Sequence, residues 1–140
     1  MLLQLSSLEK AIASLTGALS KTEDEEFMNL FDEITVNCLR AGAIQNFEFT
    51  YELSWKFIKR WLDYNIGATY VDGVPRIELF RLAAESQLIT DVEHWMTYHR
   101  ARNKTSHTYD ADVAESVYCA ARDFLTDAKL LLAALAARNA

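Results

Sequence analysis

The apolar residues of this chain recur with the period of an α-helix almost from end to end. Leu5, Leu8, Ile12, Leu15 and Leu19 alternate between spacings of three and four, which places one apolar stripe along a helix. The 140 residues include only 4 Gly and 1 Pro. Because β-sandwiches and Gly-rich phosphate-binding α/β folds need frequent tight turns, this composition disfavours both. We therefore expect an all-α protein.

The same period and its stop signals predict the remaining helices. Thr22 is a candidate N-cap for a helix that follows over residues 27–65. That helix is either continuous or consists of two collinear helices with a soft joint near Gly42. Pro75 fits the first position of a helix over residues 76–88. Thr90 or Asp91 caps a helix over residues 92–103, and a last helix begins near residue 110.

The second half of the long helix is unusually aromatic. Its aromatic residues surround the helix instead of forming one stripe: Phe47, Phe49, Tyr51, Trp55, Phe57 and Trp61. More than one face must then be covered, as in the central helix of a bundle or a helix that also meets a partner subunit. Four of the five expected helices are long enough for a bundle, and no linker interrupts them. We expect one helical domain over residues 1–140.

Charge and cysteine content restrict the partners and the compartment. The 14 basic and 20 acidic residues give a net charge of −6, which argues against electrostatic coating of nucleic acid. Two cysteines cannot form a disulfide framework, and there is no secretory leader and no apolar run of about 18 residues. We expect a cytoplasmic protein without a membrane segment. No metal-ligand or Walker pattern occurs, so we expect neither a metal nor another cofactor.

One stretch has a different charge from the rest. Residues 94–109 contain no acid but hold Arg100, Arg102, Lys104 and the three histidines His94, His99 and His107. Their formal charge of +3 leaves −9 on the remainder of the chain. A positive segment in a negative protein is what an anionic ligand site requires.

Two residues of this stretch suit phosphate chemistry. Arg102 lies on the last turn of the helix, on the same face as Trp95 and His99, and His107 follows on the loop. Arg offers a planar fork for phosphate oxygens, and His moves a proton near neutral pH. Together they can cleave RNA without a metal. The alternative is that these basic residues only cap the carbonyl end of a helix.

Two motifs carry a family resemblance. Ile44-Gln45-Asn46-Phe47-Glu48-Phe49-Thr50-Tyr51-Glu52-Leu53-Ser54-Trp55-Lys56 resembles the signature of the nucleotidyltransferase substrate-binding protein family. Arg102-Asn103-Lys104-Thr105-Ser106-His107-Thr108-Tyr109 resembles that family's second signature and the Arg-x4-His-x-Tyr pattern of the HEPN superfamily. The resemblance spans residues 5–135. It departs from the family at Gln87, where a Gly is expected, and at Tyr98-His99, where a more apolar pair is usual.

The resemblance implies an antiparallel up-and-down four-helix bundle with an additional short helix. It also implies a homodimer and a small minimal-type (MNT) nucleotidyltransferase as partner. Related HEPN proteins are ribonuclease toxins that cleave RNA without metal in a cleft across the dimer, and in some systems the partner adenylylates the motif Tyr.

Carried over by position, the resemblance assigns a role to each motif residue. Arg102 and His107 would be catalytic, Asn103 would orient the site, and Tyr109 would be the adenylylated residue. Apart from the resemblance, we expect Asn103, Lys104 and His99 to contact the substrate.

Two functions of different class remain open at this stage. The first is a metal-independent, toxin-like ribonuclease subunit controlled by its nucleotidyltransferase partner. The second is a non-catalytic subunit that binds a nucleotide or phosphate-bearing substrate for the partner, with Arg102 and Lys104 as anchors. A third possibility is a pure interaction protein whose motif only caps helices.

Overall fold

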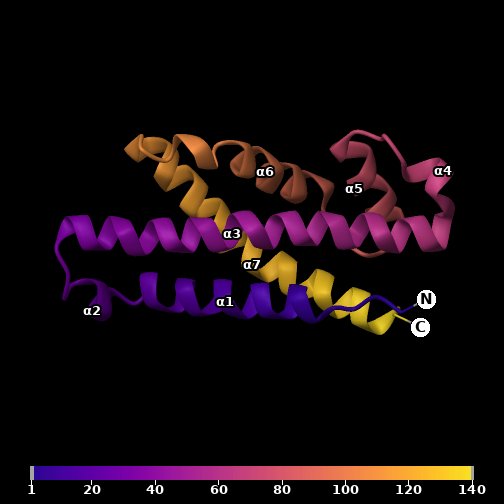
Figure 1. The fold of residues 1–140 in the computed structure, drawn as a ribbon. Coiled ribbons are helices and arrows are strands. Elements are labelled where there is room, and N and C mark those ends of the chain that lie inside the picture. Colours follow the sequence, from indigo (N-terminus) through magenta and orange to yellow (C-terminus); the bar gives the residue numbers. More distant parts are fainter. Residues whose placement is uncertain (1, 140) are drawn as a thin grey trace.

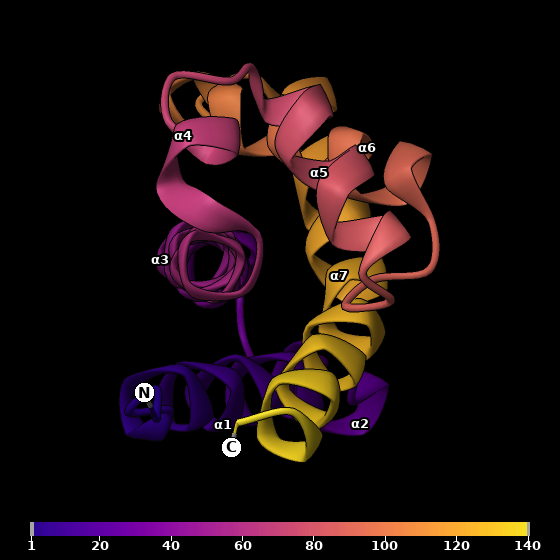
Figure 2. The ribbon, with the colours of Figure 1, turned by 90° about the vertical axis from the view of Figure 1, so that its right-hand side faces the viewer.

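Four long helices run alternately up and down in the computed structural model, which describes residues 2–139 (Figure 1). They are α1 (Ser6–Thr22), α3 (Glu33–Leu62), α6 (Val92–Asn103) and α7 (Ala111–Ala137). In Figure 2 the central helix α3 is seen end-on, with α1 below it and α6 and α7 to its right. The expected all-α, antiparallel up-and-down bundle is confirmed.

Short helical segments connect these four helices. The expected additional helix is α5 (Arg76–Glu85), which precedes α6. Sequence reasoning did not anticipate the one-turn helices α2 (Glu25–Met28) and α4 (Ala68–Val71), the π-helical turn Asp63–Gly67 or the 3-10 turn Thr105–His107. Within residues 2–139 there is no β-strand, and no helix is long and apolar enough to cross a membrane.

The entry into α3 differs from the prediction. The prediction of Thr22 as an N-cap was wrong, because it is the last residue of α1 and its hydroxyl donates to the Ala18 carbonyl at 3.1 Å. Asp24 caps α2 instead, and Asp32 caps α3 by accepting from the Thr35 amide at 2.8 Å. Asp is at least as strong an N-cap as Thr, and the two acids separate a one-turn helix from α3.

The long helix α3 is continuous through Gly42, so the alternative of two collinear helices is wrong. A mid-helix Gly costs only about 1 kcal/mol relative to Ala. The residues that follow it, Ala43 and Ile44, are buried in the core, and their packing holds the helix together. α3 is therefore one rigid element from Glu33 to Leu62.

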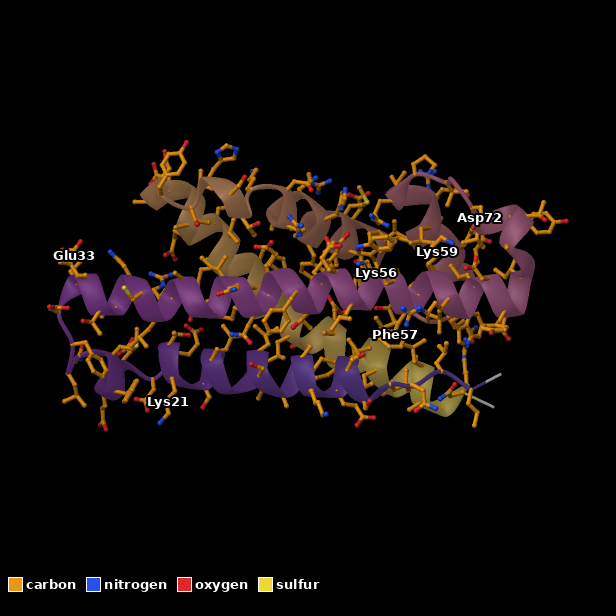
Figure 3. The ribbon with its side chains drawn as sticks, viewed as in Figure 1. Lys21, Glu33, Lys56, Phe57, Lys59 and Asp72 are labelled. Carbon is orange, nitrogen blue, oxygen red and sulfur yellow. The ribbon has the colours of Figure 1, made fainter. Side chains whose placement is uncertain are left out.

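The far end of α3 stops close to the predicted position. Gly67 ends the π-helical turn with a φ of 116°, a backbone conformation that favours glycine. The Lys59 ammonium donates to Asp63 at 3.1 Å and to Asp72 at 2.9 Å, and these hydrogen bonds raise the pKa of Lys59. Lys59 and Asp72 lie near each other in Figure 3. This contact fastens the loop after α4 back onto α3.

An aromatic cluster forms the centre of the core. The ring of Phe124 on α7 packs edge-on against four other rings at centroid distances of 5.2–6.2 Å: Phe47 and Tyr51 of α3, and Trp95 and Tyr98 of α6. All five side chains are buried. The aromatic run of α3 therefore does face several neighbours, although Phe49 remains 41% exposed. Edge-to-face packing of this kind fixes the relative placement of α3, α6 and α7.

Helix α5 begins and ends differently from the prediction. Pro75 is the N-cap with an extended backbone (ψ 158°), not the first helical residue. The helix stops at Glu85 instead of residue 88, because Gln87 adopts a φ of 63°. The Gln87 and Leu88 amides donate to the carbonyls of Ala84 and Ala83 at 3.0 and 2.9 Å, which is a Schellman C-cap. Gln87 thus occupies a backbone position that glycine usually fills.

Gln87→Gly is expected to stabilise the fold relative to Gln87→Ala by about 1 kcal/mol, because a side chain with a Cβ is strained in the left-handed region. Both variants lose the hydrogen bond from Arg138 to the Gln87 amide oxygen, so the comparison isolates the backbone term. Urea denaturation of the two variants measures the difference. Equal stabilities would contradict the account.

Candidate functional site

The second motif covers the end of α6 and the turn that follows it. Asp91 caps the start of α6 by accepting from the His94 amide at 3.1 Å, as one of the two predicted caps. The helix ends at Asn103, and the 3-10 turn Thr105–His107 follows. The Thr105 hydroxyl donates to the Arg102 carbonyl at 2.9 Å. The sequence therefore places Arg102 on a rigid helix and His107 on a short turn tied to that helix.

Arg102 turns toward α3. Its Nε donates to Glu52 Oε1 at 2.9 Å, and its Nη2 lies 3.8 Å from Glu48 Oε1. The side chain is 31% exposed, so the pair is reached by solvent. A guanidinium has five N–H donors, and bonding through Nε does not exhaust them. Arg102 is therefore positioned by two carboxylates and keeps donors for an anion.

His107 and Tyr109 project from the surface together. Their rings lie 6.0 Å apart in an edge-to-face arrangement, and Tyr109 is 85% exposed. The His107 amide donates to the Lys104 carbonyl at 3.0 Å, which sets the turn. Within residues 2–139, no hydrogen bond joins the His107 imidazole to the Arg102 guanidinium. The structure thus brings His107 to Tyr109, while Arg102 faces α3.

Asn103 and Lys104 lie at the helix end, and both are exposed. Lys104 is the C-cap of α6, and its amide donates to the Ala101 carbonyl at 3.0 Å. A cation at this position also stabilises the negative end of the helix dipole. The capping bond comes from the backbone amide, so it does not engage the Lys104 ammonium group.

His99 lies on the inner side of α6 and is only partly exposed. Its Nδ1 lies 2.9 Å from the hydroxyl of Tyr51 on α3. Burial and the nearby Arg76 guanidinium lower the pKa of His99 below its ordinary value of 6.5. Burial also raises the pKa of the Tyr51 phenol, so that group keeps its proton and can donate it to Nδ1. His99 is thus held in its neutral form between the core and the site.

Sequence reasoning missed the residues of α3 and α5 that surround Arg102. Glu52 also accepts from the Trp55 indole at 3.0 Å, and the Arg76 guanidinium stacks 3.5 Å above the Trp55 ring. The available signal was the spacing of Glu48 and Glu52, four residues apart on one helix face inside the first motif. The first motif is thus in direct contact with the second through Arg102.

The positive segment is less positive in space than in sequence. Glu48 and Glu52 offset Arg102, and the His94 ring lies 3.4 Å from both Asp91 and Asp127. The charge available to a ligand is therefore concentrated at the exposed helix end and turn. Among the described residues there is no group of three or more His, Cys, Asp or Glu side chains that can hold a metal ion.

The sequence that folds into this site matches a known family. The family model described as nucleotidyltransferase substrate binding protein like matches residues 3–137, which include both motifs. The chain belongs to this family. A Haemophilus influenzae relative described as probable ribonuclease HepT is 38% identical over 138 residues, which cover 98% of this chain and 94% of the relative.

Solved structures of this kind share the fold. One Haemophilus influenzae protein is described as having the fold of a substrate binding domain of a nucleotidyltransferase. It is 36% identical, with a TM-score of 0.91, over 95% of this chain and 99% of its own. A Thermus thermophilus protein is 27% identical, with a TM-score of 0.68, over 91% of this chain and 98% of its own. The agreement in fold extends to the helices that carry both motifs.

The lowered pKa of His99 predicts a loss of stability in acid. The unfolded chain protonates His99 at a higher pH than the folded chain does, so the free energy of unfolding falls as the pH drops through the ordinary histidine value. His99→Gln removes this contribution. Urea denaturation at pH 7.5 and pH 5 should therefore show a smaller loss for the variant than for the wild type. An equal loss would contradict a neutral, buried His99.

Proposed function

We propose that this chain is the HEPN subunit of a two-component nucleotidyltransferase system and that it cleaves RNA without a metal. The observation that carries the proposal is the folded second motif. Arg102 stands on the last turn of α6, and His107 and Tyr109 project together from the adjoining turn. The relative described as a probable ribonuclease supports the same activity for this chain.

In the proposed reaction the ribose 2′-oxygen attacks the neighbouring phosphorus. A bond forms between them, the bond from phosphorus to the 5′-oxygen breaks, and the products are a 2′,3′-cyclic phosphate and a 5′-hydroxyl. The imidazole of His107 either takes the 2′-hydroxyl proton or gives a proton to the leaving 5′-oxygen, and solvent water makes the other proton transfer. The Arg102 guanidinium stabilises the negative charge that develops on the phosphate oxygens. Both side chains belong to this chain.

The ion pair of Arg102 has a role in this mechanism. Glu52 and Glu48 fix the guanidinium before substrate arrives, so little side-chain freedom is lost when the phosphate binds. The phosphate must, however, compete with two carboxylates. The site therefore favours a phosphate that is also held elsewhere along the RNA.

A homodimer is part of the proposal. In the single chain, His107 and Tyr109 lie on an outer surface. Exposed apolar side chains occur around the start of α3, with Leu30 at 77% and Ile34 at 76% exposure. A second copy packed on this surface would enclose the motif in a cleft and cover these residues.

The second candidate function is a non-catalytic substrate-binding subunit. One support is the similar solved structure, which is described as having the fold of a nucleotidyltransferase substrate binding domain. The other is the position of Lys104 at the end of α6, next to the ion-paired Arg102. Here the helix end would hold a nucleotide or phosphate-bearing substrate for the partner enzyme. Nucleotide transfer that needs both proteins, with no RNA cleavage by either, would select this function.

RNA cleavage by the purified protein should persist in EDTA and should depend on His107. His107→Ala is expected to lower the rate more than about a hundredfold, since it removes the proton-transfer group. Because His107 is exposed, the melting temperature should not change. Cleavage of single-stranded RNA followed on denaturing gels measures the effect.

Two matched controls sharpen this test. His94→Ala removes an exposed histidine from the first turn of α6, and it should leave the rate unchanged. Arg100→Ala should cost far less than Arg102→Ala, because Arg100 is exposed and its hydrogen bond goes to Thr97 on α6 itself. Equal cleavage by wild type and His107→Ala would exclude the proposal.

Tyr109 is the proposed target of the partner. Incubation with the nucleotidyltransferase and ATP should add the mass of one AMP, because the phenol is 85% exposed and lies beside the catalytic turn. Intact-protein mass spectrometry measures the gain. Tyr109→Phe should abolish it, whereas Tyr70→Phe, which alters another exposed tyrosine, should not. A modification that survives in Tyr109→Phe would rule out this residue.

A further inference from the structure

A hollow of about 470 Å³ lies between the N-terminal half of α3 and the start of α7. Thr108 and Tyr109 line it, so it opens directly after the 3-10 turn Thr105–His107. The turn and the first residues of α7 lie beside this half of α3 in Figure 1. The volume falls within the range of small-molecule sites, about 300–1,000 Å³.

Small side chains form the apolar part of the lining of the hollow. Ala41 and Ile44 of α3 face Ala111 and Ala114 of α7 across it. Three of these four side chains are single methyl groups, so few side-chain atoms protrude from the two helices into the hollow. A lining of this kind fits a flat, rigid group better than a branched or flexible one.

The charges at the rim of the hollow are already paired. The Arg40 guanidinium lies 2.5 Å from a Glu115 carboxylate oxygen, and this hydrogen bond lowers the pKa of Glu115. The same guanidinium stacks 4.1 Å above the ring of Tyr118. Arg40 is therefore held on both sides, and Glu115 already offsets its charge at the rim. Asn37 and Thr108 add neutral hydrogen-bonding groups to the lining.

Tyr109 adds an aromatic face at the mouth of the hollow. Its ring is 85% exposed and contributes to the lining. Single-stranded RNA is recognised by unstacked bases that stack on exposed aromatic rings and bond through their edges to neutral polar groups. Small apolar side chains, neutral polar groups and an exposed tyrosine together suit a nucleobase.

We infer that this hollow is a base-binding subsite that holds one nucleobase of single-stranded RNA next to the phosphate cleaved at His107. The inference rests on the proposed ribonuclease function. The base enters between α3 and α7 and stacks on Tyr109, while its phosphate stays outside, near His107 and Arg102. The subsite supplies the additional hold on the RNA that an ion-paired Arg102 requires.

The test fills the hollow and measures binding separately from cleavage. Ala41→Phe places a ring in the hollow, and Ala68→Phe is the control, an exposed alanine in α4 at the other end of α3. Each change is made in the wild type and in the cleavage-deficient His107→Ala chain. The probe is a short, fluorescently labelled single-stranded RNA, and anisotropy gives its Kd in the His107→Ala background.

Ala41→Phe should raise both the Kd and the KM by about tenfold, the loss expected for one stacked base, at an unchanged melting temperature. Tyr109→Ala should do the same, and Tyr109→Phe should not, because it keeps the ring. If no variant cleaves RNA but Ala41→Phe still weakens binding, the subsite stands and the ribonuclease proposal fails. If cleavage depends on His107 and Ala41→Phe changes neither constant, the inference is overturned.

Discussion

The packing of aromatic rings around Phe124 sets how α3, α6 and α7 lie against one another. Helix α6 carries the second motif, and only three of its residues are buried: Trp95, Tyr98 and Ala101. Two of these three contact Phe124 edge-on, and the same ring contacts Phe47 and Tyr51 of α3. Because edge-to-face contacts tolerate little rotation, this cluster sets the distance from α6 to the acidic face of α3. The position of Arg102 relative to Glu48 and Glu52 therefore depends on how the core packs.

The helices themselves were predictable because burial imposes a visible period on each of them. The spacing in α7 predicts six inward residues. Five of them are buried (Val117, Ala120, Phe124, Leu131 and Leu135) and Val113 is half-buried, and α6 has the predicted bounds. The boundaries around α2 were not predictable. Thr22, Asp24 and Asp32 are all good N-caps, and which of them caps a helix depends on how the chain turns from α1 to α3. The end of α5 shows the same limit, since Gln87 carries none of the usual signature of a left-handed residue.

The candidate site was only half visible in the sequence. The stretch from His94 to Tyr109 stands out because it lacks acids, and it does hold the exposed His107 and Tyr109. Its partner residue, Glu52, lies 50 positions earlier in the chain, and no local pattern connects the two. Charge summed along a sequence ignores contacts between helices, so the stretch looked more positive than it is in space. The hollow beside Tyr109 was also invisible, because alanines that line it read as ordinary helix residues.

The uninterrupted length of α3 has a consequence for how this molecule moves through solution. Its 30 residues span about 45 Å, whereas a sphere with the radius of gyration of a compact domain of this size is about 37 Å across. Figure 1 shows that α3 runs the full width of the fold. An elongated particle has more friction than a sphere of equal mass, so it diffuses more slowly and elutes early from a gel-filtration column. A single copy can then be mistaken for a larger assembly by elution volume, and only a shape-independent measurement of mass counts the copies.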